Sequence, residues 1–343
     1  MARRDALALS LLPGVGAVRY AELVARFGSV AGALDDADAG IVARARSAAD
    51  ASMERAERCG ARVLWMEDAD YPAALRELYD PPPVLFTRGD PAAIAPPACA
   101  IVGTRRATAY GERVTRDLAT ALARAGVSVL SGMARGIDGT AHRAALDAGG
   151  RSAAVLGTGV DLAYPAAHAP LHARLAEHGL LISEELPGDR ASAGSFPKRN
   201  RILAALAQVT IVVEAPRRSG ALITAEHALD LHRPIAAVPG PIDAPVCAGS
   251  NQLLRDGAVL IAEVDDVLAL FGLAKPAAKR DPELVDAAER AVWGALAEGA
   301  ASLDELCARA ALPARECVAA VSALEIRGVI ECALTGEIVR RNG

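Results

Sequence analysis

The residues best suited to chemistry lie in glycine-rich turns that also carry arginine, serine or threonine. Each turn follows an apolar run with the composition of a β-strand. Backbone N–H groups in glycine turns and at helix starts bind anions, hydroxyl groups add donors, and arginine adds positive charge. These turns therefore predict an anion site. The residues concerned are Gly103, Thr104, Arg105 and Arg106, then Gly132, Arg135 and Gly136, and finally Ser219 and Gly220.

A second basic segment is the run Phe196-Pro197-Lys198-Arg199-Asn200-Arg201, which leads into an expected helix. Lys198, Arg199, Asn200 and Arg201 would gather at a helix start, where the helix dipole also attracts a phosphate. Phe196 is one of only four phenylalanines, and any base can stack on an aromatic ring. The run thus predicts binding of single-stranded DNA. The alternative is that Phe196 packs the helix onto the core and the arginines stay in water.

Catalytic and metal-binding alternatives rest on few residues. Asp138 and His142 stand four residues apart on one expected helix face, and Glu184-Glu185 end a strand, which is compatible with acid–base or metal chemistry. However, Asp138 is also placed to cap its helix, and His142 has no second ligand at metal spacing. Gly157-Thr158-Gly159 lacks the third glycine of a dinucleotide site. We expect no catalytic residue, no metal and no cofactor.

Composition limits the class of protein. The chain has 343 residues, enough for two or three domains. Its net charge of −5 argues against coating duplex DNA by bulk charge, but a local basic pocket is still possible. The six cysteines form no CxxC pair, which predicts buried thiols rather than zinc or disulfides. Asp5 interrupts the apolar N-terminal stretch, and no later segment could span a bilayer, so we expect a cytoplasmic protein without membrane contact.

A regular alternation of apolar strands and helices must position the turns. Seven strand candidates with helical crossovers predict a doubly wound, mostly parallel α/β sheet, in which ligands bind at the carboxyl ends of the strands. In the helix expected over 112–125, leucines face the sheet, whereas Arg113, Arg116 and Arg124 stay in water. The strand candidates are 98–102, 127–130, 153–156, 180–183, 209–213, 235–238 and 258–261.

Smaller units flank this sheet. Residues 1–75 predict short helices, and the turn at 12–17 is either the hairpin of a helix-hairpin-helix unit or a plain tight turn. The sheet domain is expected over 80–271 and a linker over 272–282. Residues 283–343 predict a winged helix, with three helices before two strands that join at Thr335-Gly336. Ser302 and Glu305 predict a capping box there, and the mixed charge of its third helix disfavours strong duplex binding.

Together the motifs resemble the DNA processing protein A family, also called Smf. They are VGTRRATAYG, SGMARGIDGTAHRAAL, VLGTGVDLAYP, SEELPG, FPKRNRILA, VVEAPRRSGALITAEHAL, AVPG and GSNQLLRDGA. The resemblance implies an extended Rossmann-like fold with a helical N-terminal domain and a winged helix. It also implies a protein of natural transformation that protects incoming single-stranded DNA, forms a homodimer around 223–242 and helps load RecA. The implied DNA pocket would use Thr104, Arg105, Gly132, Arg135, Phe196, Arg199, Asn200 and Arg201.

The chain departs from the family pattern at one position, and two other functions remain as alternatives. Some members have a lysine three residues before the Phe-Pro pair, where this chain has Ala193, so one cation is missing. A phosphoribohydrolase-like nucleotide glycosidase is the first alternative function. Glu214, Ser219-Gly220 and Glu226 echo the strand, turn and helix of such enzymes, but their fuller diglycine turn is absent. Duplex-DNA regulation through the winged helix is the second.

Overall fold

The computed structural model describes residues 2–192, 194–273, 284, 286–299, 301–332 and 336–340. The chain divides into two units, residues 1–274 and 275–343. Most of the expected linker over 272–282 lies outside the described residues, as do Ala193 and Thr335 of the expected wing turn.

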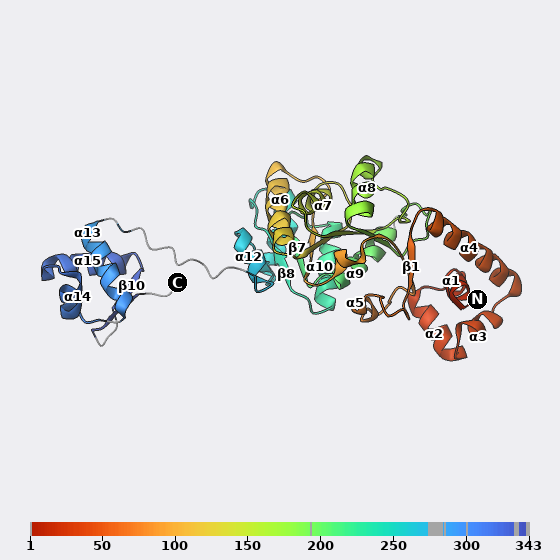
Figure 1. Ribbon diagram of the computed structural model, residues 1–343, viewed down its shortest axis with the longest axis horizontal. Coiled ribbons are helices and arrows are strands. Elements are labelled where there is room, and N and C mark those ends of the chain that lie inside the picture. The colour runs from red at the N-terminus through yellow and green to blue at the C-terminus, as the bar shows by residue number, and fades with distance from the viewer. Residues whose placement is uncertain are drawn as a thin grey trace. The chain divides into compact units, whose positions relative to one another are not determined.

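A nine-stranded sheet forms the centre of the first unit (Figure 1). Its strand order is β1-β2-β6-β5-β4-β3-β7-β8-β9. The stretch from β6 to β9 is parallel throughout, whereas β2 pairs antiparallel with β6 and β1 pairs antiparallel with β2. The predicted doubly wound fold is confirmed, and all seven expected strands form. They are β3 (Ala98–Val102), β4 (Ser128–Ser131), β5 (Ser152–Leu156), β6 (Leu180–Ser183), β7 (Val209–Val212), β8 (Ile235–Ala237) and β9 (Val259–Leu260).

The winding of the sheet reverses between β3 and β7. From β3 the chain adds β4, β5 and β6 on one side, and it then returns to place β7, β8 and β9 on the other. Loops leave neighbouring strands in opposite directions at such a point, which opens a crevice at the carboxyl edge of the sheet. A ligand site is therefore expected where β3, β4 and β7 end.

Helices cover both faces of the sheet. One face packs α6 (Ala109–Arg124), α7 (Ile137–Asp147) and α12 (Val264–Ala269), and the other packs α9 (Ser195–Leu206) and α10 (Gly220–Asp230). Because successive strand residues face opposite sides, Cys99 and Ile101 join the first core, whereas Ala98, Ala100 and Val102 join the second. The remaining helices of this part are α5 (Ala73–Arg76), α8 (Ala169–His178) and α11 (Ala248–Arg255).

The N-terminal helices share their core with one end of the sheet. They are α1 (Ala2–Ser10), α2 (Ala17–Phe27), α3 (Val30–Asp35) and α4 (Ala39–Arg58), and their apolar residues pack with β2 (Val84–Gly89) and α8. A strand, β1 (Arg62–Trp65), forms within the range expected to be helical. It forms because it can pair with β2 and bury Leu64 and Trp65 there.

The second unit has the order of a winged helix. Its helices α13 (Ala287–Ala295), α14 (Leu303–Ala310) and α15 (Ala314–Ile326) precede β10 (Ile330–Cys332) and β11 (Ile338–Arg340), which pair antiparallel. The predicted capping box at Ser302 and Glu305 is confirmed. In the part of the chain that the structure describes, no helix is long and apolar enough to cross a membrane.

Candidate functional site

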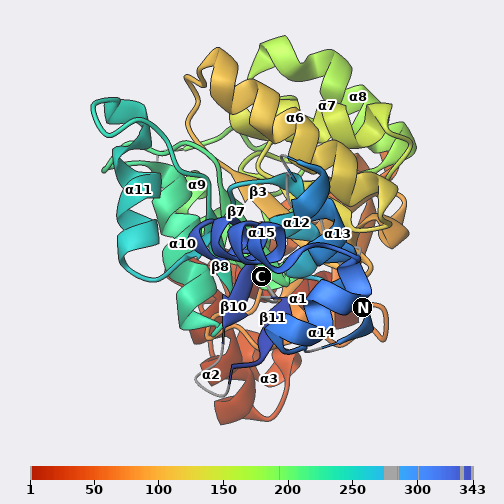
Figure 2. The ribbon, with the colours of Figure 1, turned by 90° about the vertical axis from the view of Figure 1, so that its left-hand side faces the viewer.

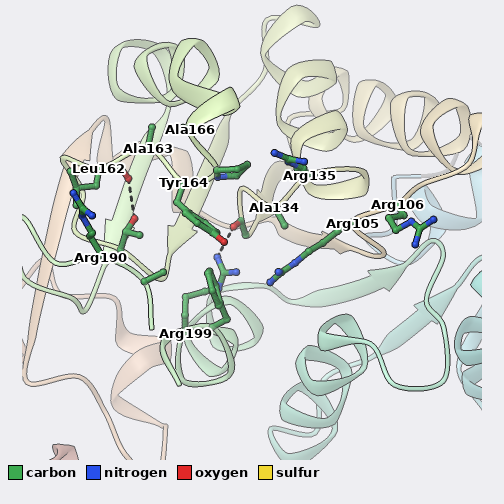
Figure 3. Close-up of a pocket in the computed structure, with 15 residues that line it drawn as sticks. Arg105, Arg106, Ala134, Arg135, Leu162, Ala163, Tyr164, Ala166, Arg190 and Arg199 are labelled. Carbon is green, nitrogen blue, oxygen red and sulfur yellow. Dashed lines mark hydrogen bonds between the residues drawn. The ribbon is translucent and has the colours of Figure 1, made fainter. Parts of the chain in front are cut away.

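The glycine turns meet in a cavity of about 890 Å³ at the carboxyl ends of β3, β4 and β5 (Figure 3). Arg105 and Arg106 come from the turn after β3, Gly132 and Arg135 from the turn after β4, and 158–166 from the loop after β5. A second cavity of about 430 Å³ shares residues with the first and extends to the start of α10 after β7. The smaller cavity therefore lies in the crevice where the winding reverses, and the larger one adjoins it.

Most of the predicted site residues line one or both cavities. Gly136 does not, but a Cβ atom there would lie 2.4 Å from the Thr104 carbonyl oxygen, and its φ is +72°. This glycine therefore brings the turns after β3 and β4 into contact. Lys198 and Arg201 also lie outside. The lining residues that the sequence predicted are Gly103, Thr104, Arg105, Arg106, Gly132, Arg135, Phe196, Arg199, Asn200, Ser219 and Gly220.

An aromatic pair and an arginine lie at the centre of the site. The ring centroids of Tyr164 and Phe196 are 5.4 Å apart, and the Arg105 guanidinium carbon is 5.1 Å from the Phe196 centroid. Both distances suit attractive ring–ring and cation–ring contacts. Phe196 is half-buried, whereas 47% of Tyr164 is exposed. Tyr164 therefore offers the more accessible of the two rings. In Figure 3 the side chains of Tyr164 and Arg105 point toward Arg199.

Arg199 forms part of the cavity wall and is buried. Its Nη1 donates to the carbonyl oxygens of Gly132, at 2.8 Å, and of Val155, while its Nε donates to Asn200 Oδ1 at 3.2 Å. Burial lowers the pKa of Arg199 to about 10, although nearby Asp138 acts in the opposite direction. A Cβ at Gly132 would lie 2.4 Å from Arg199 Nη2, so only glycine permits this approach. Arg199 thus joins the ends of β4 and β5.

Arg201 has its partners elsewhere. Its guanidinium pairs with Asp80 at 2.8 Å and with Glu184 at 3.0 Å, and 5% of its side chain is exposed. Lys198 also pairs with Glu184, at 3.3 Å, and is half-exposed. The sequence placed both cations in the DNA site. In the structure both lie outside the two cavities and pair with acids, and Arg201 reaches Asp80 from 121 positions away in the sequence.

The N-terminal turn at 12–17 faces acidic groups. It lines a cavity of about 170 Å³ together with Glu184, Glu185 and Asp189. Burial raises the pKa of Glu185, and neighbouring Lys198 lowers it in part. Carboxylates repel phosphate, so this environment favours the plain-turn alternative over a phosphate-binding hairpin.

Asp138 and His142, two of the residues weighed for catalysis, make structural contacts. Asp138 Oδ2 accepts the backbone N–H groups of Gly132 at 3.1 Å and Ala134 at 3.3 Å, which fixes the turn after β4. Burial raises the Asp138 pKa. His142 is fully buried with Nδ1 at 2.8 Å from Ser152 Oγ, and burial lowers its pKa to about 3, so its ring is neutral at physiological pH. No group of three metal-ligating side chains occurs among the described residues.

Among the lining residues that the sequence did not predict are one tyrosine and two arginines. Tyr164 and Arg190 line the larger cavity, and Arg218 lines the smaller one. Each lies in a loop without periodicity, although Arg218 directly precedes the predicted Ser219-Gly220 turn. Together with three arginines that the sequence predicted, the two missed arginines form a group of exposed side chains around the cavities. None of the five forms an ion pair with an acid that the structure describes. We call this set the arginine rim: Arg105, Arg106, Arg135, Arg190 and Arg218.

An ion pair ties the N-terminal helices to the loops that carry Tyr164 and Arg190. Asp161, whose side chain is 11% exposed, accepts Arg55 Nε from α4 at 2.7 Å and the Gly188 N–H at 2.8 Å. The Gly159 N–H donates to the Asp189 carbonyl at 2.9 Å, which joins the same loops again. The position of α4 therefore helps set one wall of the larger cavity.

Comparison with known proteins gives consistent matches. The DNA recombination-mediator protein A family matches residues 62–272, and the DprA winged helix domain matches residues 275–333. The chain is 42% identical over 301 residues to a protein named DprA from Mycobacterium tuberculosis, covering 82% of this chain and 77% of that one. It is also similar to the X-ray structure of DNA processing protein A from Streptococcus pneumoniae. That match has a TM-score of 0.67 and 32% identity and covers 78% of this chain and 95% of the other. The Helicobacter pylori protein, solved for its single-stranded DNA binding mode, matches with a TM-score of 0.56 and 31% identity, over 61% of this chain and 95% of that one.

Proposed function

The chain belongs to the DNA recombination-mediator protein A family, and from this premise we propose that it binds single-stranded DNA in the paired cavities at the sheet edge. The observation that carries the proposal is the exposed Tyr164 ring, which lies against Phe196 at a tilt in a cavity that four rim arginines also line. Aromatic rings that stack bases, next to cations that hold the backbone, are the usual elements of a single-strand site.

This arrangement selects single strands for a geometric reason. Bases inside a duplex are stacked on their neighbours and cannot present a free face to a ring within a cavity, whereas an unpaired base can. Rim arginines and the N–H groups of the glycine turns would contact phosphates, which is compatible with any base sequence. Arg199 would act indirectly, since most of its donors already bind carbonyl oxygens.

The same proposal extends to DNA processing in the cell. We infer that the protein protects incoming single strands in natural transformation and helps load RecA. Support comes from the relatives named DNA processing protein and from the H. pylori protein solved for its single-stranded DNA binding mode. RecA filament growth on oligonucleotides should accelerate in the presence of the protein, and unchanged growth would contradict this part.

A homodimer through 223–242 is part of the proposal. Leu229 is 59% exposed and Ile242 is fully exposed in this segment, and Val259 and Leu260 are exposed on the adjacent edge strand β9. Exposed apolar side chains at a sheet edge suit burial against a second copy. Sedimentation should show a dimer for the native chain and a monomer for Ile242→Asp; a monomeric native chain would rule the dimer out.

The nucleotide-glycosidase alternative has less support. Its first candidate, Glu214, is buried and accepts the Thr108 hydroxyl at 2.5 Å and the Thr108 N–H at 3.0 Å, so it anchors the start of α6. Glu226 is exposed and lines neither cavity of the site. Incubation with nucleoside monophosphates should release no base, and clear release would favour the enzyme.

Fluorescence anisotropy with oligo-dT tests the DNA site directly. The native chain should prefer a single strand of about 15 nucleotides over a duplex of that length. Arg105→Ala should weaken single-strand binding about tenfold and reduce the slope of log affinity against log salt by about 0.7. Arg151→Ala is the matched control, because Arg151 precedes β5 at the opposite edge of the sheet. Equal affinity for both DNA forms, or no effect of Arg105→Ala, would refute the proposed site.

A further inference from the structure

A second arginine-lined groove runs between α6 and α7. Its volume is about 490 Å³. The two helices lie side by side on the sheet face opposite α9 and α10 (Figure 2). From α6 it receives Arg116, Thr120 and Arg124, which recur every four residues and so share one side of the helix. From α7 it receives Thr140 and Arg143.

The groove carries excess positive charge. Arg116, Arg124 and Arg143 are exposed and have no ion-pair partner among the residues that the structure describes. Arg143 donates a hydrogen bond of 3.4 Å to the Thr140 hydroxyl. Two carboxylates, Glu112 and Asp147, also line the groove, but Arg174 pairs with Asp147 at 2.8 Å. Among the described residues that line the groove, three arginines are therefore opposed by one carboxylate that has no ion-pair partner.

The groove begins next to the proposed DNA site. Arg106 lies just before α6 and Arg135 just before α7, so both helices start at the edge where the cavities open. In Figure 3 the Arg106 and Arg135 side chains point away from Tyr164 and Arg199. Along α6, Arg116 and Arg124 follow at positions about 12 Å apart on the helix axis. Arginines thus continue from the rim along the groove.

We propose that a single DNA strand leaving the Tyr164 cavity continues along the α6–α7 groove, held there through its phosphates. This inference rests on the proposed function and extends its site. Guanidinium and hydroxyl groups are phosphate ligands, and the described residues that line the groove include no aromatic ring on which a base could stack. The two parts of the path therefore differ: the cavity stacks bases, and the groove contacts only the backbone.

Strand length separates the groove from the cavity in a binding experiment. The probes are oligo-dT of about six nucleotides, which the cavities can hold, and of about 25 nucleotides, which reaches beyond them. A third probe of the longer length has about six nucleotides at one end and abasic sugars elsewhere. The proteins are the full native chain, the double variant Arg116→Glu/Arg143→Glu, and the control Arg113→Glu, since Arg113 is exposed on α6 but does not line the groove.

The double variant should bind the longer oligo-dT at least about tenfold more weakly than the native chain, and the short one with less than about a twofold change. Its salt slope on the longer strand should fall by about 1.4, or about 0.7 for each phosphate contact removed. The native chain should bind the abasic probe nearly as tightly as full oligo-dT. Arg113→Glu should behave as native. Unfolding in urea should match for all three proteins, since the changed residues are exposed.

Three outcomes would contradict the proposal that the groove binds the strand through its phosphates. They are unchanged binding of the longer strand by the double variant, an equal loss on both lengths, and loss of the length advantage with the abasic probe. Failure of the proposed function looks different, because the native chain would then bind neither oligo-dT length. The milder pair Arg116→Gln/Arg143→Gln should show the same length dependence with a smaller effect, which guards against a general disturbance by reversed charges.

Discussion

The arginines of the 196–201 run and those of the arginine rim belong to the same region but have different environments. Arg199 and Arg201 are buried, and their donors bind carbonyl oxygens or acids of the protein itself. The rim arginines, such as Arg105 and Arg190, are exposed. A charge whose donors are already used maintains the shape of a site, whereas an exposed charge remains available for a ligand. Substitutions in the two groups should therefore separate stability from binding.

The largest effect is expected at Arg201. Arg201→Ala leaves Glu184 and Asp80 without their main cation, and removing one partner of a buried ion pair costs about 3–5 kcal/mol of unfolding free energy. Urea unfolding followed by circular dichroism measures the loss. The control is Arg58→Ala, which removes an exposed ion pair with Glu54 within α4 and should change the unfolding free energy by less than about 1 kcal/mol. A loss for Arg201→Ala no larger than for Arg58→Ala would contradict the assigned role.

The buried side of the site should also be sensitive to acid. Because burial lowers the His142 pKa from 6.5 to about 3, the unfolded chain binds a proton there first as the pH falls. The unfolding free energy should therefore decrease by about 1.4 kcal/mol for each pH unit below about 6.5, or about 2–3 kcal/mol near pH 4.5. His142→Gln should lack this component, and Arg105→Ala should keep it. Parallel pH profiles for native and His142→Gln would count against the buried neutral histidine.

A smaller effect, on binding alone, is expected at Tyr164. Tyr164→Ala should weaken oligo-dT binding by about 1–3 kcal/mol, the usual contribution of one base stacked on a ring. Stability should change little, since the ring is half-exposed. Tyr164→Phe should retain the affinity because it keeps the ring. If Tyr164→Ala instead reduced stability and left affinity intact, Tyr164 would belong with the buried group.

The smallest effect is expected at Lys198. This side chain is half-exposed, pairs with Glu184 and lies outside both cavities of the site. Lys198→Ala should change stability by about 1 kcal/mol at most and leave the affinity for oligo-dT unchanged. A tenfold loss of affinity measured by anisotropy would return Lys198 to the DNA site and weaken the distinction between the two groups.

The sequence predicted the sheet better than it predicted the site. Apolar runs alternating with helices were enough to place seven strands, and the glycines after β3, β4 and β5 marked the edge at which the cavities lie. The pairing of Arg201 with Asp80 joins residues 121 positions apart, so local sequence contains no sign of it. Tyr164 and Arg190 lie in irregular loops that only tertiary contacts position. Strand β1 was missed because a four-residue strand depends on its partner β2 for stability.

The ion pair between Arg55 and Asp161 links the evolution of α4 to that of the loop after β5. A descendant that lost α4 would keep a largely buried Asp161 with no cation beside it, and would disturb the loops that carry Tyr164 and Arg190. An unpaired buried carboxylate is costly, so the loss of the helix should be followed by replacement of the acid. Positions 55 and 161 are thus expected to change together across relatives. Relatives that lack the N-terminal helices should have a residue other than aspartate at position 161.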